Sequence, residues 1–112
     1  MKNKIISSFA EEDWEINKRV FDDRNESIHL FKNKTLLQLS FGHYAQGYFD
    51  ILKMRHGYER GLSSSQIIVS LNNDSVRSNK ISGNLVNFDN LIKQYEYFDK
   101  FLHFPIVFLE LI

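Results

Sequence analysis

The sequence contains no cysteine and a single proline, Pro105. Without thiols the chain forms no disulfide and no thiolate metal site, which is compatible with a reducing compartment. The chain also has no excess of either charge, because 14 acidic residues balance 14 basic ones. A protein-wide positive field of the kind that favours nucleic acid is therefore absent, and we expect nucleic acid to be an unlikely partner.

Long hydrophobic runs are missing as well. Near the N-terminus the apolar run is only Ile5-Ile6, far short of the ~7–15 residues of a signal peptide core. The C-terminal "PIVFLELI" is shorter than the ~18 residues that a membrane helix needs. We therefore expect a cytoplasmic protein without a membrane segment.

The chain has enough apolar residues for a core of its own. Of its 112 residues 43% are hydrophobic, and ten are phenylalanine. This length is close to that of a typical domain, and no repeat or linker interrupts it. We predict one domain over residues 1–112.

The N-terminal half contains one helix signal and one hairpin signal. "SFAE" at residues 8–11 reads as a capping box, which predicts a helix from about Phe9 to Phe21. The alternation in "WEINKRV" also permits an extended segment there. "SIHLF" and "TLLQLSF", separated by "KNK", predict a β-hairpin.

The middle of the chain is ambiguous. "YFDILKMRH" at residues 48–56 fits a strand that extends the hairpin, which we favour, or a helix that ends at Gly57. "QIIVSL" is typical of a strand because it is rich in β-branched residues. "NNDSVRSNKISGN" is typical of a loop, although its length leaves room for a short strand.

The C-terminal part carries the strongest periodicity. Apolar residues recur at three- and four-residue steps on one helical face, namely Phe88, Leu91, Ile92, Tyr95, Phe98 and Leu102. Asn87 is the expected cap and Pro105 the expected stop. "IVFLELI" then predicts a strand buried on both faces. Together the elements predict an α+β fold: a mainly antiparallel sheet of about four to six strands, with an N-terminal and a C-terminal helix on one face.

Four histidines are the obvious candidates for chemistry. They stand at positions 29, 43, 56 and 103, without the HxH or HxxxH spacing of metal ligands. We therefore predict no metal and no cofactor. His29 is expected within a half-buried strand, and His103 near a helix C-terminus, which favours a cation.

The stretch Gly42–Gly61 gives an enzyme hypothesis. His43, His56, Glu59 and Arg60 could supply the acid, the base and the cation that metal-independent RNA cleavage needs, with Lys53 nearby. The alternative is a solvated sheet edge whose charges discourage aggregation. We prefer this alternative, because any small basic strand would show the same spacing.

Residues 10–26 form an acidic block, with seven acidic and three basic side chains. One interpretation is that the acids complement a helix dipole and keep the surface soluble. The other is a docking face for a basic protein, with Trp14 as an aromatic anchor. The docking interpretation predicts these partner-binding residues: Glu11, Glu12, Asp13, Trp14, Glu15, Asp22 and Asp23.

The chain resembles the small immunity proteins of bacterial toxin systems, such as those that neutralise contact-dependent growth-inhibition toxins. The resemblance lies in its size, its lone α+β domain, and an Asn/Lys/Ile/Phe-rich composition seen in "MKNKIISSFAEEDWEIN" and "GNLVNFDNLIKQYEYF". It implies a non-catalytic inhibitor that binds one cognate toxin, often a nuclease, as a heterodimer. The alternative hypotheses are the ribonuclease above and a non-catalytic module that forms a homodimer through a strand edge.

Overall fold

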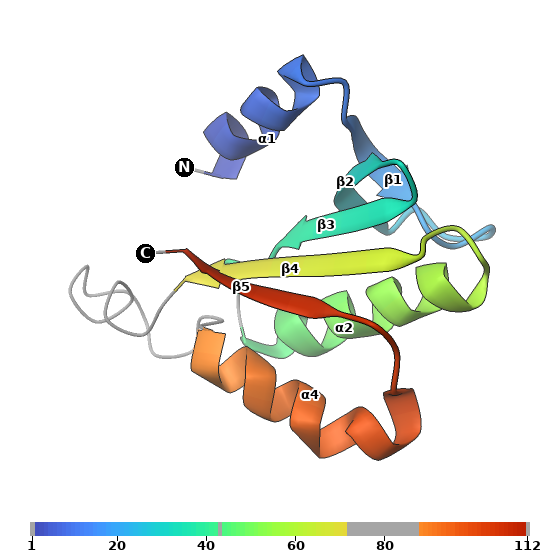
Figure 1. The fold of residues 1–112 in the computed structure, drawn as a ribbon, viewed down its shortest axis with the longest axis vertical. Helices are drawn as coiled ribbons and strands as arrows, with labels where there is room; N and C mark the ends of the chain where they lie inside the picture. Colours follow the sequence, from blue (N-terminus) through green and yellow to red (C-terminus); the bar gives the residue numbers. More distant parts are fainter. Residues whose placement is uncertain (1, 43, 72–87, 112) are drawn as a thin grey trace.

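The computed structural model describes residues 2–42, 44–71 and 88–111 (Figure 1). The described chain forms a single sheet flanked by helices. Its elements are, in order, α1 (Lys2–Glu11), β1 (Glu15–Arg19), β2 (Ser27–Lys32), β3 (Thr35–Leu39), α2 (Tyr44–Glu59), β4 (Ser65–Leu71), α4 (Phe88–Leu102) and β5 (Val107–Leu111).

The five strands lie in the order β1-β2-β3-β4-β5. β1, β2 and β3 pair antiparallel, as adjacent strands joined by short turns do. β4 pairs parallel to β3, and β5 parallel to β4. The predicted α+β class is confirmed, with a five-stranded sheet and helices near both ends of the described chain. The sheet is mixed because α2 carries the chain back to start β4 beside the start of β3.

Helices cover both faces of the sheet. α2 and α4 lie on one face, where Met54 and Leu91 pack with Leu36 and Ile68 of the sheet in the main core. α1 lies on the other face, where its apolar residues pack over Leu30, Leu37 and Leu39. The two terminal helices are therefore on opposite faces, because side chains of β3 alternate between the two cores.

The N-terminal helix predicted from about Phe9 to Phe21 ends early, at Glu11. Ser8 is inside this helix rather than at its cap, and its hydroxyl donates to the Lys4 carbonyl at 3.0 Å. Asp13 has a positive φ of 68°, so the chain turns there. The extended interpretation of "WEINKRV" is confirmed by β1.

The strand that we favoured at residues 48–56 is wrong, because this stretch lies inside α2. Gly57 is not a cap either, since the helix continues to Glu59. A Cβ at Gly57 would stand 2.7 Å from Cδ1 of Leu36. The missing side chain thus lets α2 lie close against β3.

The remaining predicted elements are confirmed with one difference. The hairpin is β2–β3, "QIIVSL" is in β4, and the C-terminal periodic segment is α4. β5 is an edge strand rather than one buried on both faces: Val107 is 51% and Leu109 is 46% exposed. The predicted loop "NNDSVRSNKISGN" and the predicted cap Asn87 lie outside the described residues.

Across the ranges that the structure describes, no helix combines the length and the apolar character needed to cross a membrane.

Candidate functional site

Six polar side chains meet where β2 and β3 face α2, and we call them the polar cluster: His29, Gln38, Ser40, Gln46, Asp50 and Lys53. Gln38, Ser40, Asp50 and Lys53 are at most 5% exposed. Polar groups so deeply buried are costly unless they are paired. Their concentration in one place makes this cluster the first candidate for a functional site.

Local geometry explains how the sequence brings the polar cluster together. In β3, Leu37 and Leu39 point toward α1, so the alternate residue Gln38 points toward α2. On α2, Asp50 and Lys53 are three residues apart and therefore lie on the same helical face. The alternation along β3 and the three-residue spacing on α2 therefore direct these polar side chains to the same buried region.

The carboxylate of Asp50 is the centre of the cluster. Oδ1 accepts from Nε2 of Gln38 and from Nε2 of Gln46, each at 3.1 Å, and lies 3.3 Å from Nζ of Lys53. Oδ2 accepts from the Ser40 hydroxyl at 2.7 Å. Both oxygens are therefore engaged by protein donors.

Lys53 compensates this buried charge. Its side chain is only 6% exposed, and Nζ also donates to the carbonyl of Ser27 at 2.9 Å. The ammonium lies 5.2 Å from the centre of the Phe49 ring, within the range of a cation–π contact. Asp50 and Lys53 thus form an internal ion pair with additional hydrogen bonds, as a buried pair requires.

The side chains of His29 and Gln38 take the place of backbone hydrogen bonds where β2 and β3 separate. The backbone pairing of β2 with β3 runs from Lys32–Thr35 to Leu30–Leu37. Beyond it, the backbone N–H of His29 donates to Oε1 of Gln38 at 2.9 Å, and that of Leu39 donates to Nδ1 of His29 at 3.1 Å. The two side chains therefore satisfy backbone donors that the ladder leaves open.

The protonation state of His29 follows from this position. Desolvation by burial is the largest influence and lowers the pKa of His29 from 6.5 to about 4. The positive charges of Lys2 and Lys53 lower this pKa further, and Asp50 opposes them. The imidazole is accordingly neutral at pH 7, and its Nδ1 is the acceptor.

The polar cluster does not have the donor set of a divalent metal site. It contains one carboxylate, and an ammonium group already lies beside it. In residues 2–42, 44–71 and 88–111, no three His, Asp or Glu side chains gather around a common point. Mg²⁺ and Ca²⁺ prefer several oxygen ligands, of which carboxylates are the strongest.

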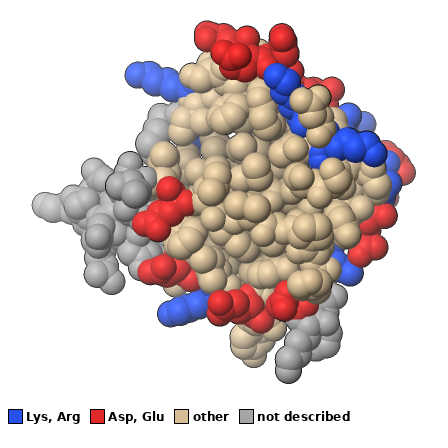
Figure 2. All heavy atoms as spheres, viewed as in Figure 1, with Lys and Arg blue, Asp and Glu red and all other residues tan. Residues whose placement is uncertain are grey.

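The predicted acidic docking residues are spread along the surface from the end of α1 to the β1–β2 connection. Glu15 pairs with Lys18 at 3.3 Å, and Asp22 with Arg60 at 2.6 Å. Trp14 is half-buried and packs edge-on against Phe9, with ring centres 5.2 Å apart. In the view of Figure 2, charged residues surround a broad uncharged area. A docking role for these residues stays a prediction.

The residues of the ribonuclease hypothesis are engaged in separate contacts. His56 stacks on Phe21 with ring centres 4.5 Å apart. Glu59 pairs with Arg55 at 2.8 Å, and Arg60 with Asp22. His43 lies outside the described residues. The hypothesis therefore receives no support from these side chains, although it named Lys53, which belongs to the polar cluster.

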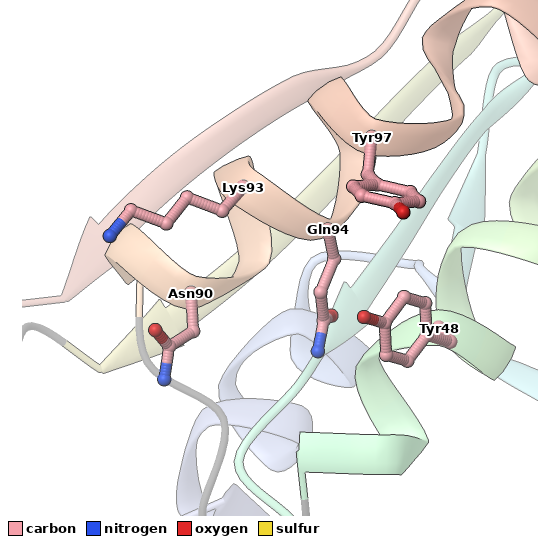
Figure 3. Close-up of a pocket in the computed structure, with 5 residues that line it drawn as sticks. All are labelled: Tyr48, Asn90, Lys93, Gln94 and Tyr97. Atoms are coloured by element: carbon pink, nitrogen blue, oxygen red, sulfur yellow. The ribbon is translucent and has the colours of Figure 1, made fainter.

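A second feature is a depression of about 290 Å³ between α2 and α4 (Figure 3). Tyr48 of α2 and four residues of α4 line it, namely Asn90, Lys93, Gln94 and Tyr97. Lys93 is the one charged group among these lining residues. Its lining thus supplies neither a carboxylate nor a histidine, so we do not take it as the active site.

Sequence reasoning missed the polar cluster as a unit. Gln38 and Ser40 in "LLQLSF" were a usable signal, because two polar residues on one face of an otherwise apolar strand need buried partners. Their partner Asp50, with Lys53 beside it, lies on a segment that we predicted as a strand, which would have pointed these two residues to opposite faces.

Comparison with family models and with solved structures points to restriction endonucleases. The family model of restriction endonuclease BglII/BglIII matches residues 1–110. The crystal structure of restriction endonuclease BglII complexed with a DNA 16-mer has the same fold, with a TM-score of 0.79 at 13% identity. The match covers 95% of this chain and 52% of that chain, so this chain spans about half the length of the solved protein. No curated protein matches the sequence.

These matches correct the functional predictions. The resemblance to immunity proteins is wrong, and with it the predicted toxin partner and the predicted absence of enzymatic function. The resemblance rested on size and composition, which many unrelated small proteins share. The argument against nucleic acid rested on net charge, which does not describe the local arrangement of cations. The chain belongs to the restriction endonuclease BglII/BglIII family.

Proposed function

We propose that the protein acts on duplex DNA as a nuclease of the BglII/BglIII type. The observation that carries this proposal is the family match over residues 1–110, and the shared fold of a BglII structure complexed with DNA supports it. A nuclease was the alternative to the inhibitor hypothesis, but with other residues and with RNA as its substrate. We place this function in the cytoplasm, and we treat residues 1–112 as one domain.

Duplex DNA is compatible with a net charge of zero, because phosphates are bound by local cations. Lys2 and Lys4 are exposed on the first turn of α1, where the helix dipole adds positive potential. Lys2 is close enough to His29 to lower its pKa. Lys2 therefore lies near the polar cluster, and both lysines are our candidates for phosphate contacts.

The direct test is binding of a fluorescently labelled duplex by the purified protein, followed by anisotropy. We expect duplex to bind in preference to single-stranded RNA of the same length, with an affinity that falls as salt rises. Equal or weaker binding to duplex than to RNA would overturn the proposal. Incubation of supercoiled plasmid with the protein and MgCl₂ tests the cleavage step in the same preparation.

A charge-reversal variant locates the DNA-binding surface. Lys2→Glu/Lys4→Glu should weaken duplex binding and lower the slope of log K against log salt by about 2, since each phosphate contact contributes about 0.9. Lys93→Glu on α4, which lies in the depression of Figure 3, is the control and should leave the slope unchanged. A slope unchanged in the α1 variant would exclude this surface.

Nucleases commonly hydrolyse phosphodiesters with one or two divalent cations held by carboxylates. The polar cluster does not fit such a cation, because it has one carboxylate that already has a cationic partner. We therefore derive no catalytic step through a metal in the polar cluster.

A further inference from the structure

We infer that the polar cluster is closed to divalent cations, and that the ammonium of Lys53 takes the charge-compensating place that a metal would fill beside Asp50. The inference concerns the site that the proposed function would require. It can be tested without DNA, so its failure is separate from a failure of that proposal.

The first support is that the oxygens of Asp50, the amide oxygen of Gln38 and Nδ1 of His29 already accept hydrogen bonds. Oδ1 and Oδ2 of Asp50 accept from Gln38, Ser40 and Gln46. Oε1 of Gln38 and Nδ1 of His29 accept from backbone N–H groups of β2 and β3. A cation that used these atoms would leave buried donors unpaired, which costs about 1–3 kcal/mol for each group.

The second support is charge. With Asp50 ionised and Lys53 protonated, the described cluster is neutral, because the His29 imidazole is neutral at pH 7. An added Mg²⁺ or Mn²⁺ would bring two positive charges to within a few ångströms of a buried ammonium. Removing water from Mg²⁺ is costly, and a neutral site does not provide enough attraction to offset that cost.

The third support is the position of the two neutral side chains. Gln38 contacts Asp50 directly, and the His29 ring accepts from the backbone N–H of Leu39 and is close enough to Asp50 to feel its charge. If both positions carried carboxylates, the cluster would hold three. The scaffold is therefore suited to a cation, and the side chains at positions 29, 38 and 53 are what exclude it.

A variant that gains binding of a divalent cation tests this arrangement. His29→Asp/Gln38→Glu adds two carboxylates next to Asp50, and the change at position 38 is nearly isosteric. Ligand charge controls the affinity of such sites over orders of magnitude. The control is Ile16→Glu/Val107→Glu, which adds the same charge at two exposed positions on the two edge strands of the sheet.

The experiment is a Mn²⁺ titration of ¹⁵N-labelled protein without DNA, followed by paramagnetic broadening of the amide signals. In wild type we expect no selective broadening at residues 29, 38–40 and 50 up to about 1 mM Mn²⁺, because the site lacks the several oxygen ligands that bind such ions tightly. The gain-of-binding variant should broaden these signals selectively at a concentration at least about tenfold lower. The control should broaden like wild type.

Selective broadening of the cluster in wild type, at the concentrations that affect the gain-of-binding variant, would overturn the inference. If that double variant does not fold, Gln38→Glu alone and a thermal shift measurement replace it. The Tm of wild type should then be unchanged by Mn²⁺, and the Tm of Gln38→Glu should rise. A rise of equal size in wild type would also overturn the inference.

Discussion

The middle and the C-terminal end of α2 use the same kind of contact in opposite surroundings. At its middle, Asp50 and Lys53 form a pair of 3.3 Å whose side chains are 1% and 6% exposed. At its C-terminal end, Arg55 and Glu59 form a pair of 2.8 Å whose side chains are 30% and 55% exposed. The shorter pair is the weaker contributor, because solvent screens it, whereas breaking the buried pair leaves an uncompensated charge. Burial, rather than distance, separates a structural ion pair from a surface one.

This difference also shows why the ribonuclease hypothesis receives no support. It named His56, Glu59 and Arg60, which stand close together in the chain at the exposed end of α2. The cooperative polar group lies at the middle of α2, with partners from two strands.

Asp50→Asn should have the largest effect. It removes the carboxylate beside the buried ammonium of Lys53, which then keeps its hydrogen bond to the carbonyl of Ser27. We expect a loss of about 3–5 kcal/mol in the free energy of unfolding, measured by urea denaturation. Asp50→Asn/Lys53→Met, which removes both charges, should recover part of this loss. If Asp50→Asn loses less than about 1 kcal/mol in the free energy of unfolding, as expected for a solvated pair, burial does not distinguish the two ion pairs.

Gly57→Ala tests the close contact of α2 with the sheet near the C-terminal end of the helix. The new methyl group would lie 2.7 Å from Cδ1 of Leu36, which is fully buried. Overpacking costs about 1–3 kcal/mol and opposes a gain of about 1 kcal/mol in helix propensity. We therefore expect a net loss of about 1 kcal/mol in the same assay. The double variant Gly57→Ala/Leu36→Val should lose less free energy of unfolding than the two single variants lose in sum. If the losses simply add, the two residues are not in contact.

Acidification tests His29 within the polar cluster. Its pKa is lowered from 6.5 to about 4 in the folded protein, so the unfolded chain binds more protons between these values. The contribution of neutral His29 is complete above pH 6.5 and is lost as the pH falls toward 4. We expect a loss on the order of 1 kcal/mol between pH 7 and pH 5, after allowance for partial solvation.

His29→Gln is the control for this pH effect, because glutamine does not titrate. The pKa values of Asp99 and Glu26 are lowered by His103 and Arg24, so these carboxylates titrate below most of this window. The variant should accordingly lose less stability than wild type over the same pH range. Equal losses in both proteins would show that His29 is not the group responsible.

Glu59→Gln should have the smallest effect. It removes the charge from the exposed pair with Arg55 and should change the free energy of unfolding by at most about 0.5 kcal/mol. The difference from wild type should shrink further in 0.5 M salt, which screens exposed charges. A change as large as that of Asp50→Asn would remove the distinction between the buried and the exposed ion pair of α2.

Much of the fold was predictable from local pattern. The alternation in "TLLQLSF" and the three- and four-residue steps from Phe88 onward indicate β3 and α4, because each element has one apolar face. β5 was predictable as a strand, but its edge position depends on strand order, which local pattern does not carry. The N-terminal helix was misplaced because Ser8 satisfied a capping pattern without being at a helix start.

The candidate site was not predictable in the same way. α2 buries Asp50 and Lys53, so its inner face is partly polar, and its apolar spacing fits helix and strand alike. The hydrogen bonds that satisfy Asp50 come from Gln38 and Ser40, in an earlier part of the chain. A constellation built from distant segments requires the fold before it can be recognised.

The most direct test of the account is duplex binding measured by anisotropy in EDTA and in MgCl₂ at matched ionic strength. We predict binding in both buffers, with dissociation constants within about threefold of each other. Phosphate contacts provide the affinity, and the polar cluster binds no cation. Binding that appears only with Mg²⁺ would contradict the metal-free cluster, and no duplex binding in either buffer would contradict the proposed action on DNA.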